Sequence, residues 1–405
     1  MPAEPSLSRR LGVGDAVVIG LGSMVGAGVF AVWEPAAQAA GSGLLIGLAL
    51  AAVVAYCNAA SSAQLAAVYP VSGGTYVYGR ERLGEWWGFA AGWCFVAGKT
   101  ASCAAMALTF ATYVVPGTEW LQRLLALAAV IALAAVNYRG VTRTARLTRI
   151  LVACTLTVLA LVLVVLFTGE PHRDLPSLAG TSPYGVLQAA GLLFFAFAGY
   201  ARIATMGEEV RDPARTIPRA ISIAVLVAIG IYLAVGVALL RVLDPASTAA
   251  PLAAAVDTVG AALASLGALL ALIAGIGRTT LAMARNHDLP GWLAAVHPRF
   301  QVPHHAEIAL AVVVGILVLT TDLRGVIGFS SFGVLLYYAI ANASAFTQPA
   351  DQRRWPRALN VIGLVGCVVL AVTLPWTSAV TAAALLALAL IVRAVRTGRA
   401  GSARS

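Results

Sequence analysis

The sequence predicts an all-helical membrane protein with about twelve transmembrane helices, built as two five-helix repeats of opposite orientation and two extra helices. Hydrophobic residues make up 60% of the 405 residues and charged residues only 11%, whereas soluble domains carry about 25% charged residues. Apolar runs of about 20 residues, the length that crosses a bilayer, recur along the whole chain. The first and the sixth of these runs are interrupted by small residues, which predicts two broken helices at equivalent places in the two repeats.

Each apolar run gives one expected helix. The first covers about 13–32 and follows a basic tail, which is also typical of a signal peptide. Because this run is too long for a signal peptide, we expect a retained helix. The other helices are expected at about 44–67, 86–115, 120–136, 147–168, 184–206, 217–240, 262–284, 308–321, 326–346, 359–374 and 377–392.

The runs leave no room for a separate soluble domain, so residues 1–405 are expected to form one transmembrane domain. Its first repeat spans about 11–168, its second repeat about 184–346, and the two extra helices about 357–396. The five cysteines are scattered through the apolar runs, which predicts neither a disulfide framework nor a metal site. No cofactor is expected.

The arginines divide unevenly between the two sides of the expected membrane. If the N-terminus is cytoplasmic, the outer segments hold only Arg123, Arg173, Arg241 and Arg324. Because Lys and Arg concentrate on the cytoplasmic side of membrane proteins, we expect both termini in the cytoplasm and a multi-pass protein in the plasma membrane of a bacterial cell. The net charge of +10 is then a consequence of this topology. The lipid bilayer is an expected partner, and no nucleic acid partner is expected.

The first apolar run contains Gly20, Gly22, Gly26 and Gly28. A glycine in a helix costs about 0.5–1 kcal/mol relative to alanine, so a helix that only had to span the membrane would not gather them. Two interpretations are open. The glycines form a close helix–helix contact of the small-xxx-small kind, or the backbone opens here, which at membrane depth requires surrounding protein or a water-filled cavity.

A second break lies in the sixth run, at 194–200. It follows the first break by five helices, which is typical of paired breaks in an inverted repeat and favours the open-backbone interpretation. A half-helix that starts near Gly26 would turn free N–H groups toward a carboxylate. Carbonyls near Met24 and at the end of the other half-helix, near Phe197 and Ala198, would accept hydrogen bonds from an ammonium group. The two breaks together predict a site for both ends of an α-amino acid.

Four stretches of the sequence carry a resemblance that covers nearly the whole chain. They are 22–30 in the first run, 70–76 after the second run, 195–199 continued by 208–213 and 217–220, and 283–285 with 288–290. In these motifs the sequence resembles the amino acid–polyamine–organocation (APC) superfamily of permeases. The resemblance implies a LeuT-like fold with five-plus-five inverted repeats, an amino acid or a related amine as substrate, and transport by alternating access.

Carried over by position, the resemblance also implies roles for single residues. The amides of Ala27 and Gly28 would bind the substrate carboxylate. The carbonyls of Met24 and Ala198 would bind its amino group, and Phe195 would be an aromatic gate over the substrate. The expected substrate-binding residues are Met24, Val25, Gly26, Ala27, Gly28, Thr100, Phe195, Phe197, Ala198 and Gly199.

The sequence departs from the superfamily pattern at the positions expected for coupling. Many relatives carry a lysine midway along the fifth helix, where this chain has Thr155, and an acidic residue after the second break, where it has Arg202. The only lysine, Lys99, lies in the third run beside Thr100, which is expected to face the substrate cavity. Because ionisable groups inside a membrane are candidates for function, Lys99 and Thr155 are the coupling candidates. Alternatively, Lys99 is a tether that binds carbonyls of a broken helix.

The function that the sequence predicts is proton-coupled uptake of a neutral amino acid, with sodium as the alternative coupling ion. The intramembrane cations lack an acidic partner in the sequence pattern, which disfavours a cationic substrate. The first alternative is an exchanger or importer of cationic amino acids or polyamines. A second alternative, from another class, is a membrane sensor on a transporter scaffold. No cluster of catalytic side chains recurs at the helix ends, so an enzyme is not expected.

Overall fold

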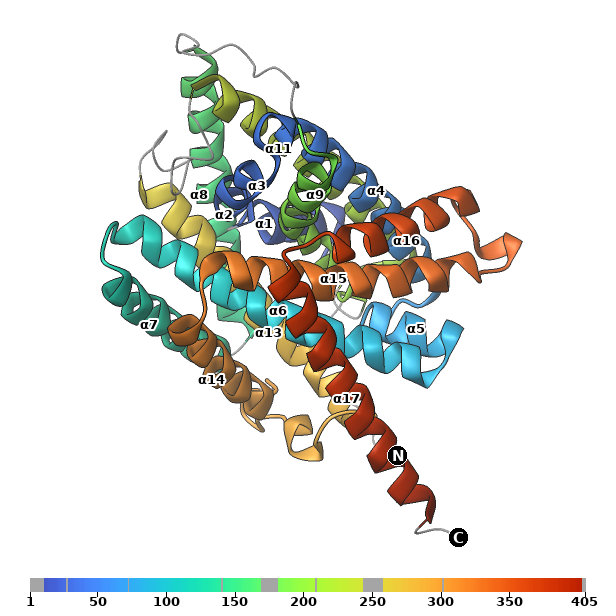
Figure 1. Cartoon of the computed structure of the whole chain (residues 1–405). Helices are drawn as coiled ribbons and strands as arrows, with labels where there is room; N and C mark the ends of the chain where they lie inside the picture. The colour runs from blue at the N-terminus through green and yellow to red at the C-terminus, as the bar shows by residue number, and fades with distance from the viewer. Residues whose placement is uncertain are drawn as a thin grey trace.

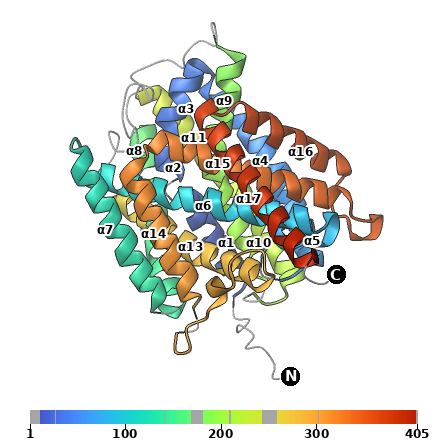
Figure 2. The ribbon, with the colours of Figure 1, turned by 60° about the horizontal axis from the view of Figure 1, so that its bottom comes forward.

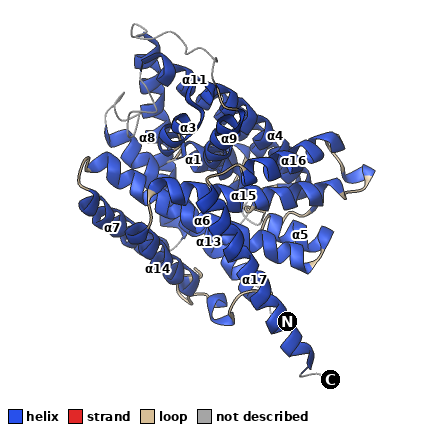
Figure 3. Cartoon of the chain, in the orientation of Figure 1, coloured by secondary structure: helices blue, strands red, loops and turns tan. Residues whose placement is uncertain are grey.

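The computed structural model of the chain is all-helical, and Figure 3 shows no strand in the described part of the chain. The structure describes residues 11–26, 28–71, 73–139, 141–168, 181–207, 210–242, 258–300 and 302–402. Ala27, one of the two residues expected to present an amide to a substrate, lies outside these ranges.

The helices follow the order of the expected apolar runs (Figure 1). The first half of the chain forms α1 (Val13–Val25), α2 (Gly28–Ala31), α3 (Trp33–Ala40), η1 (Gly41–Gly43), α4 (Leu44–Val68), α5 (Thr75–Leu83), α6 (Glu85–Val114), α7 (Glu119–Tyr138) and α8 (Val141–Thr168). The second half forms α9 (Pro183–Phe197), η2 (Ala198–Tyr200), α10 (Ala201–Ala204), α11 (Pro213–Val242), α13 (Thr258–Arg285), η3 (Gly291–Ala294), α14 (His304–Thr320), α15 (Leu323–Phe346), η4 (Ala350–Gln352), α16 (Arg357–Val372) and α17 (Trp376–Ser402).

The predicted fold class is confirmed. Nine helical stretches in the described ranges are long and apolar enough to cross a membrane, and three shorter apolar helices accompany them, at Ile150–Leu161, His304–Thr320 and Arg357–Val372. Together they make the expected twelve. The expected first crossing, 13–32, agrees with the stretch Val13–Ala31, whereas the second stretch begins earlier than expected, at Trp33, because α3 and η1 lead into α4.

Local signals explain where several helices begin. Ser182 accepts a hydrogen bond from the N–H of Gly185 and stands before Pro183, a combination that favours a helix start at α9. Asp322 caps α15 in the same way by accepting from the N–H of Gly325. Gly84 separates α5 from α6 with a φ of 103°, a backbone conformation that residues with a Cβ rarely adopt. The chain can therefore turn sharply between these two helices.

Large apolar side chains are exposed on the outer helices. Trp120 on α7, Ile316 on α14, Val372 on α16 and Leu388 on α17 are each more than half exposed. Figures 1 and 2 show α7 and α14 side by side at one edge of the molecule, and α16 at another edge. So much exposed apolar surface is unfavourable in water, whereas in a bilayer it contacts lipid tails.

Helices α1 and α9 lie among the other helices of the bundle (Figure 1). Helix α1 packs against α8, α11 and α13, and α9 packs against α3, α4 and α15. Every residue from Gly20 to Val25 is buried, as are most residues of α9. The two interrupted helices are therefore shielded from lipid by the others, which is the condition under which backbone can open at membrane depth.

Candidate functional site

The first predicted break is present in the structure. Helix α1 ends at Val25, Gly26 leaves the helical conformation with a ψ of −134°, and α2 begins at Gly28. The glycines also form a close packing seam, because a Cβ on Gly20 or Gly22 would overlap a side chain of a neighbouring helix. Both interpretations that the sequence left open therefore apply. The same run of glycines packs closely against neighbouring helices and interrupts the helix at Gly26.

The second predicted break follows Phe197, where α9 gives way to the 3-10 turn η2 and then to α10. The two breaks touch. A Cβ on Gly28 would lie 2.8 Å from the Cα of Ala196, and a Cβ on Gly199 would overlap the backbone of Ser23. Glycine at both positions allows the two backbones to approach each other at the centre of the bundle.

Lys99 on α6 reaches this junction. Its side chain is only 4% exposed, and its Nζ donates a hydrogen bond of 3.0 Å to the carbonyl oxygen of Ala198. The hydroxyl of Tyr338 on α15 donates to the same oxygen at 3.4 Å, and its ring stacks on Tyr200. The contact expected of a tether is thus observed. The carbonyl that was expected to bind a substrate amino group already holds an ammonium group of the protein itself.

Two further tyrosines bind carbonyls of the broken helices. The hydroxyl of Tyr232 on α11 donates to the oxygen of Ala196 at 3.0 Å, and that of Tyr113 on α6 donates to the oxygen of Phe30 at 3.3 Å. Carbonyls at helix ends have no partner within their helix, and inside a membrane each unsatisfied one costs several kcal/mol. Buried hydroxyl groups supply the missing donors here. No sequence signal marks these tyrosines, because a tyrosine in an apolar helix is more often a packing residue.

The remaining residues of the first break and of α9 lie at the same junction. Met24, Val25 and Phe197 are fully buried, and Phe195 is 5% exposed. Phe197 packs edge-on against the ring of Tyr232, with 4.8 Å between the ring centroids. The structure therefore brings together most of the predicted substrate-binding residues, in a closed arrangement.

Thr100 lies elsewhere, which corrects the expectation that it faces the cavity at the breaks. It lines a separate cavity between α6, α14, α15 and α17, and its hydroxyl donates to the carbonyl of Val96 in its own helix. Successive residues of a helix point about 100° apart. Because Lys99 points toward the breaks, Thr100 cannot.

The coupling candidate Thr155 is buried on α8, the helix that packs against α1, and its hydroxyl donates to the carbonyl of Leu151 in its own helix. Arg202 on α10 donates a hydrogen bond of 3.0 Å to the hydroxyl of Thr205, just beyond the end of the helix. Both residues lie on helices that pack against α1, the helix that ends at the first break.

A twelve-helix bundle with two touching breaks at its centre defines a polytopic membrane transporter. The model of the amino acid permease family matches residues 11–395, and the chain belongs to this family. The resemblance that the four motifs carry is thereby confirmed.

Relatives from several organisms agree with this assignment. The chain is 58% identical to an uncharacterized transporter of Mycobacterium tuberculosis, over 96% of this chain and 92% of the relative. It is 27% identical to the branched-chain amino acid permease BcaP of Bacillus subtilis, over 96% and 93% of the two chains. It is also 28% identical to cationic amino acid transporter 4 of Homo sapiens, over 84% of this chain and 60% of that one.

Proposed function

We propose that this permease carries a neutral amino acid across the bacterial plasma membrane by alternating access, with protons as the coupling ion and with both termini in the cytoplasm. The observation that supports the proposal best is the contact between the two breaks, with Gly28 against Ala196 and Gly199 against Ser23. Backbone groups of both broken helices meet there, at the centre of the membrane-spanning bundle. Sites of this kind recognise substrate at the interface of two inverted repeats.

In this proposal, the substrate replaces Lys99 as the hydrogen-bond donor to the second break. Without substrate, the ammonium group of Lys99 binds the carbonyl of Ala198. An amino acid that enters the site presents its own ammonium group to this carbonyl, and its carboxylate pairs with Lys99 and with the backbone around Gly28. The contact between α6 and η2 is then replaced by contacts through the substrate. This replacement couples substrate binding to the relative position of the two helices.

The buried charge of Lys99 also selects among substrates. A second cation in the same cavity would be repelled by the ammonium group, so a neutral side chain is favoured over an arginine, lysine or polyamine substrate. The name of the Bacillus subtilis relative, a branched-chain amino acid permease, agrees with this preference. The alternative, a carrier of cationic amino acids, rests on the name of the human relative.

A two-part experiment tests the proposal. Thermal unfolding of the purified protein is measured with leucine, arginine and putrescine, and uptake of radiolabelled leucine is measured in proteoliposomes with and without an inward proton gradient. We expect stabilisation by leucine and uptake that increases with the gradient. Stabilisation by putrescine or arginine alone would support the cationic alternative, and stabilisation by leucine without any flux would support a sensor.

A further inference from the structure

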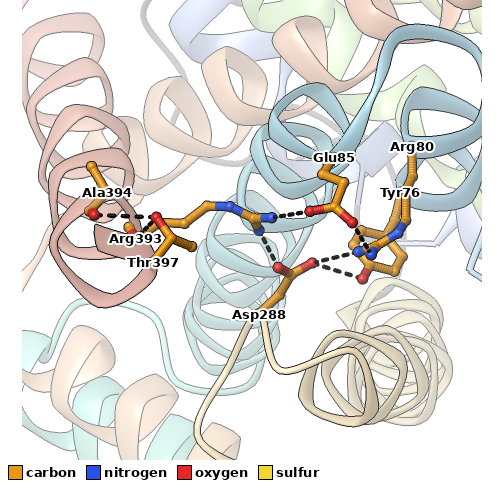
Figure 4. A network of polar contacts seen from close by, with 7 residues as sticks. All are labelled: Tyr76, Arg80, Glu85, Asp288, Arg393, Ala394 and Thr397. Carbon is orange, nitrogen blue, oxygen red and sulfur yellow. Dashed lines mark hydrogen bonds and ion pairs between the residues drawn. The ribbon is translucent and has the colours of Figure 1, made fainter. Parts of the chain in front are cut away.

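A network of charged residues joins α17 to α5 and to the start of α6 (Figure 4). The guanidinium group of Arg393 on α17 forms ion pairs with Asp288, which follows α13, and with Glu85 at 3.6 Å. Asp288 also accepts a hydrogen bond of 2.7 Å from the hydroxyl of Tyr76 and lies 3.5 Å from Arg80. Burial and the Asp288 carboxylate raise the pKa of Tyr76 to about 12, so its hydroxyl keeps the proton that it donates.

This network forms the wall of a cavity of about 460 Å³. Arg80, Arg393, Arg396 and His287 line it together with the two carboxylates, so positive charge is in excess even with a neutral histidine. The side chain of Arg393 is only 9% exposed, and its Nε is buried without a hydrogen-bond partner among the described residues. Such an unsatisfied donor on a charged group favours an additional acceptor in the cavity.

A second, apolar cavity of about 700 Å³ adjoins the first one. It lies between α6, α14, α15 and α17, and its lining includes Ala309, Leu310 and Val313. Trp93, Leu289 and Leu385 line both cavities. The basic cavity and the apolar cavity therefore meet at these three side chains.

The two cavities lie at the depths that a phospholipid requires. Trp86, Trp87 and Trp292, at the same end of the bundle, are each about half exposed, which is typical of the aromatic belt at a membrane surface. Leu385 and Arg393 lie eight positions apart on α17, roughly 12 Å at 1.5 Å per residue. When Arg393 lies at headgroup level, Leu385 therefore lies inside the roughly 30 Å hydrocarbon layer.

We propose that the two cavities together bind an anionic phospholipid. Its phosphate lies between Arg393, Arg396 and His287, and one acyl chain enters the apolar cavity past Leu385. The charge of the first cavity and its continuity with the second identify this occupant. A soluble anion would not use the apolar cavity, and a zwitterionic lipid would gain less from the excess of arginine. The phosphate also shares Arg393 with Asp288 and Glu85, so the lipid contacts the network that joins α17 to α5.

Native mass spectrometry of the purified full-length protein tests the proposal. The protein is mixed with equimolar phosphatidylglycerol and phosphatidylcholine of the same chain length, and the lipid that stays bound is identified. We expect phosphatidylglycerol to be retained preferentially. Arg396→Gln should lower this preference about fivefold, the effect of one arginine near an anionic headgroup. Arg219→Gln, which removes an equally exposed arginine on α11, should leave it unchanged.

A second pair of variants tests the acyl chain. Ala309→Phe fills the apolar cavity and should reduce the retention of both lipids, and Ala309→Leu should reduce it less. Equal retention of the two lipids, an equal effect of Arg396→Gln and Arg219→Gln, or unchanged retention in both Ala309 variants would overturn the proposal. Full displacement of the lipid by inorganic phosphate would show an anion site without an acyl-chain site. None of these readouts depends on transport, so the result is independent of the proposed function.

Discussion

Lys99, the only lysine in the sequence, donates a hydrogen bond to the carbonyl of Ala198 at the second break. A buried ammonium group needs acceptors, since leaving it without them inside a membrane is strongly unfavourable. The carbonyl of Ala198 supplies one because helix α9 has ended at Phe197. The carbonyl group freed by the second break thus stabilises the buried ammonium group on α6.

Replacing Lys99 with methionine is expected to reduce leucine uptake about tenfold or more, since a hydrogen bond to a charged group contributes about 1.5–3 kcal/mol. We also expect the variant to lose its response to the proton gradient. Uptake in proteoliposomes at several gradients measures both effects. Thr100→Ala is the matched control, because this neighbour faces the other cavity. A methionine variant with an unchanged response to the gradient would exclude a coupling role for Lys99.

Gly28→Ala is expected to abolish uptake, because the added Cβ would lie 2.8 Å from the Cα of Ala196, and that backbone cannot move away without separating the breaks. Insertion and topology should stay intact. The matched control is Gly230→Ala on α11, where nothing lies within 4 Å of the added Cβ and the exposed helix should tolerate alanine. Normal uptake by the Gly28 variant would contradict the assignment of the site.

At the level of elements, Asp288 and Arg393 join two parts of the chain that lie far apart in the sequence, the neighbouring helices α5 and α6 and the helix α17. Tyr76 and Arg80 come from α5, Glu85 starts α6, and Arg393 comes from α17. Asp288 is only 5% exposed on its side chain. A carboxylate so deeply buried between two arginines holds α17 against α5.

Asp288→Asn is expected to destabilise the protein, because it leaves the buried guanidinium of Arg393 without its nearest carboxylate. Breaking a buried ion pair in this way costs about 3–5 kcal/mol. Thermal unfolding in detergent should show a lower Tm, and the double variant Asp288→Asn with Arg393→Met should recover part of the loss. Asp351→Asn, an exposed aspartate in η4, is the control. Equal stability of the Asp288 and Asp351 variants would show that the network contributes nothing measurable.

At the scale of the molecule, the surface and the centre of the bundle differ in what they contact. The outer faces of α7, α14, α16 and α17 expose large apolar side chains, and the centre holds the breaks and their polar partners. A bundle of this kind is stable only when lipid covers the outside. If the nine long stretches and the three shorter apolar helices of the described residues all cross the membrane, α1 begins and α17 ends on the same side of it.

Reporter fusions test that arrangement. A periplasm-active phosphatase fused after α17 should be inactive, and a cytoplasm-active fluorescent protein at the same position should be bright, because the arginines favour cytoplasmic termini. The same pair of reporters placed in the connection between α7 and α8 should also report the cytoplasm. Phosphatase activity at the C-terminus would contradict either the number of crossings or the orientation.

The sequence by itself determined the fold class, the approximate bounds of the long helices and the positions of both breaks. These features are local: an apolar run long enough to cross a bilayer and a gathering of small residues can each be recognised within about 20 residues. The motifs at 22–30 and 195–199 added the family. The residues expected at the site followed from the breaks, and their role in substrate binding stays a prediction.

Only the tertiary structure decided which side chains donate hydrogen bonds to the carbonyls at the breaks. Lys99 and Ala198 are 99 positions apart, and Asp288 and Arg393 are 105 positions apart. In a membrane protein both the lipid-facing and the buried side of a helix are apolar, so the apolar pattern does not fix how a helix is rotated about its axis. The rotation of α6 turns Lys99 toward the breaks and Thr100 away from them. The rotations of α11 and α15 bring the hydroxyl groups of Tyr232 and Tyr338 to carbonyls at the breaks.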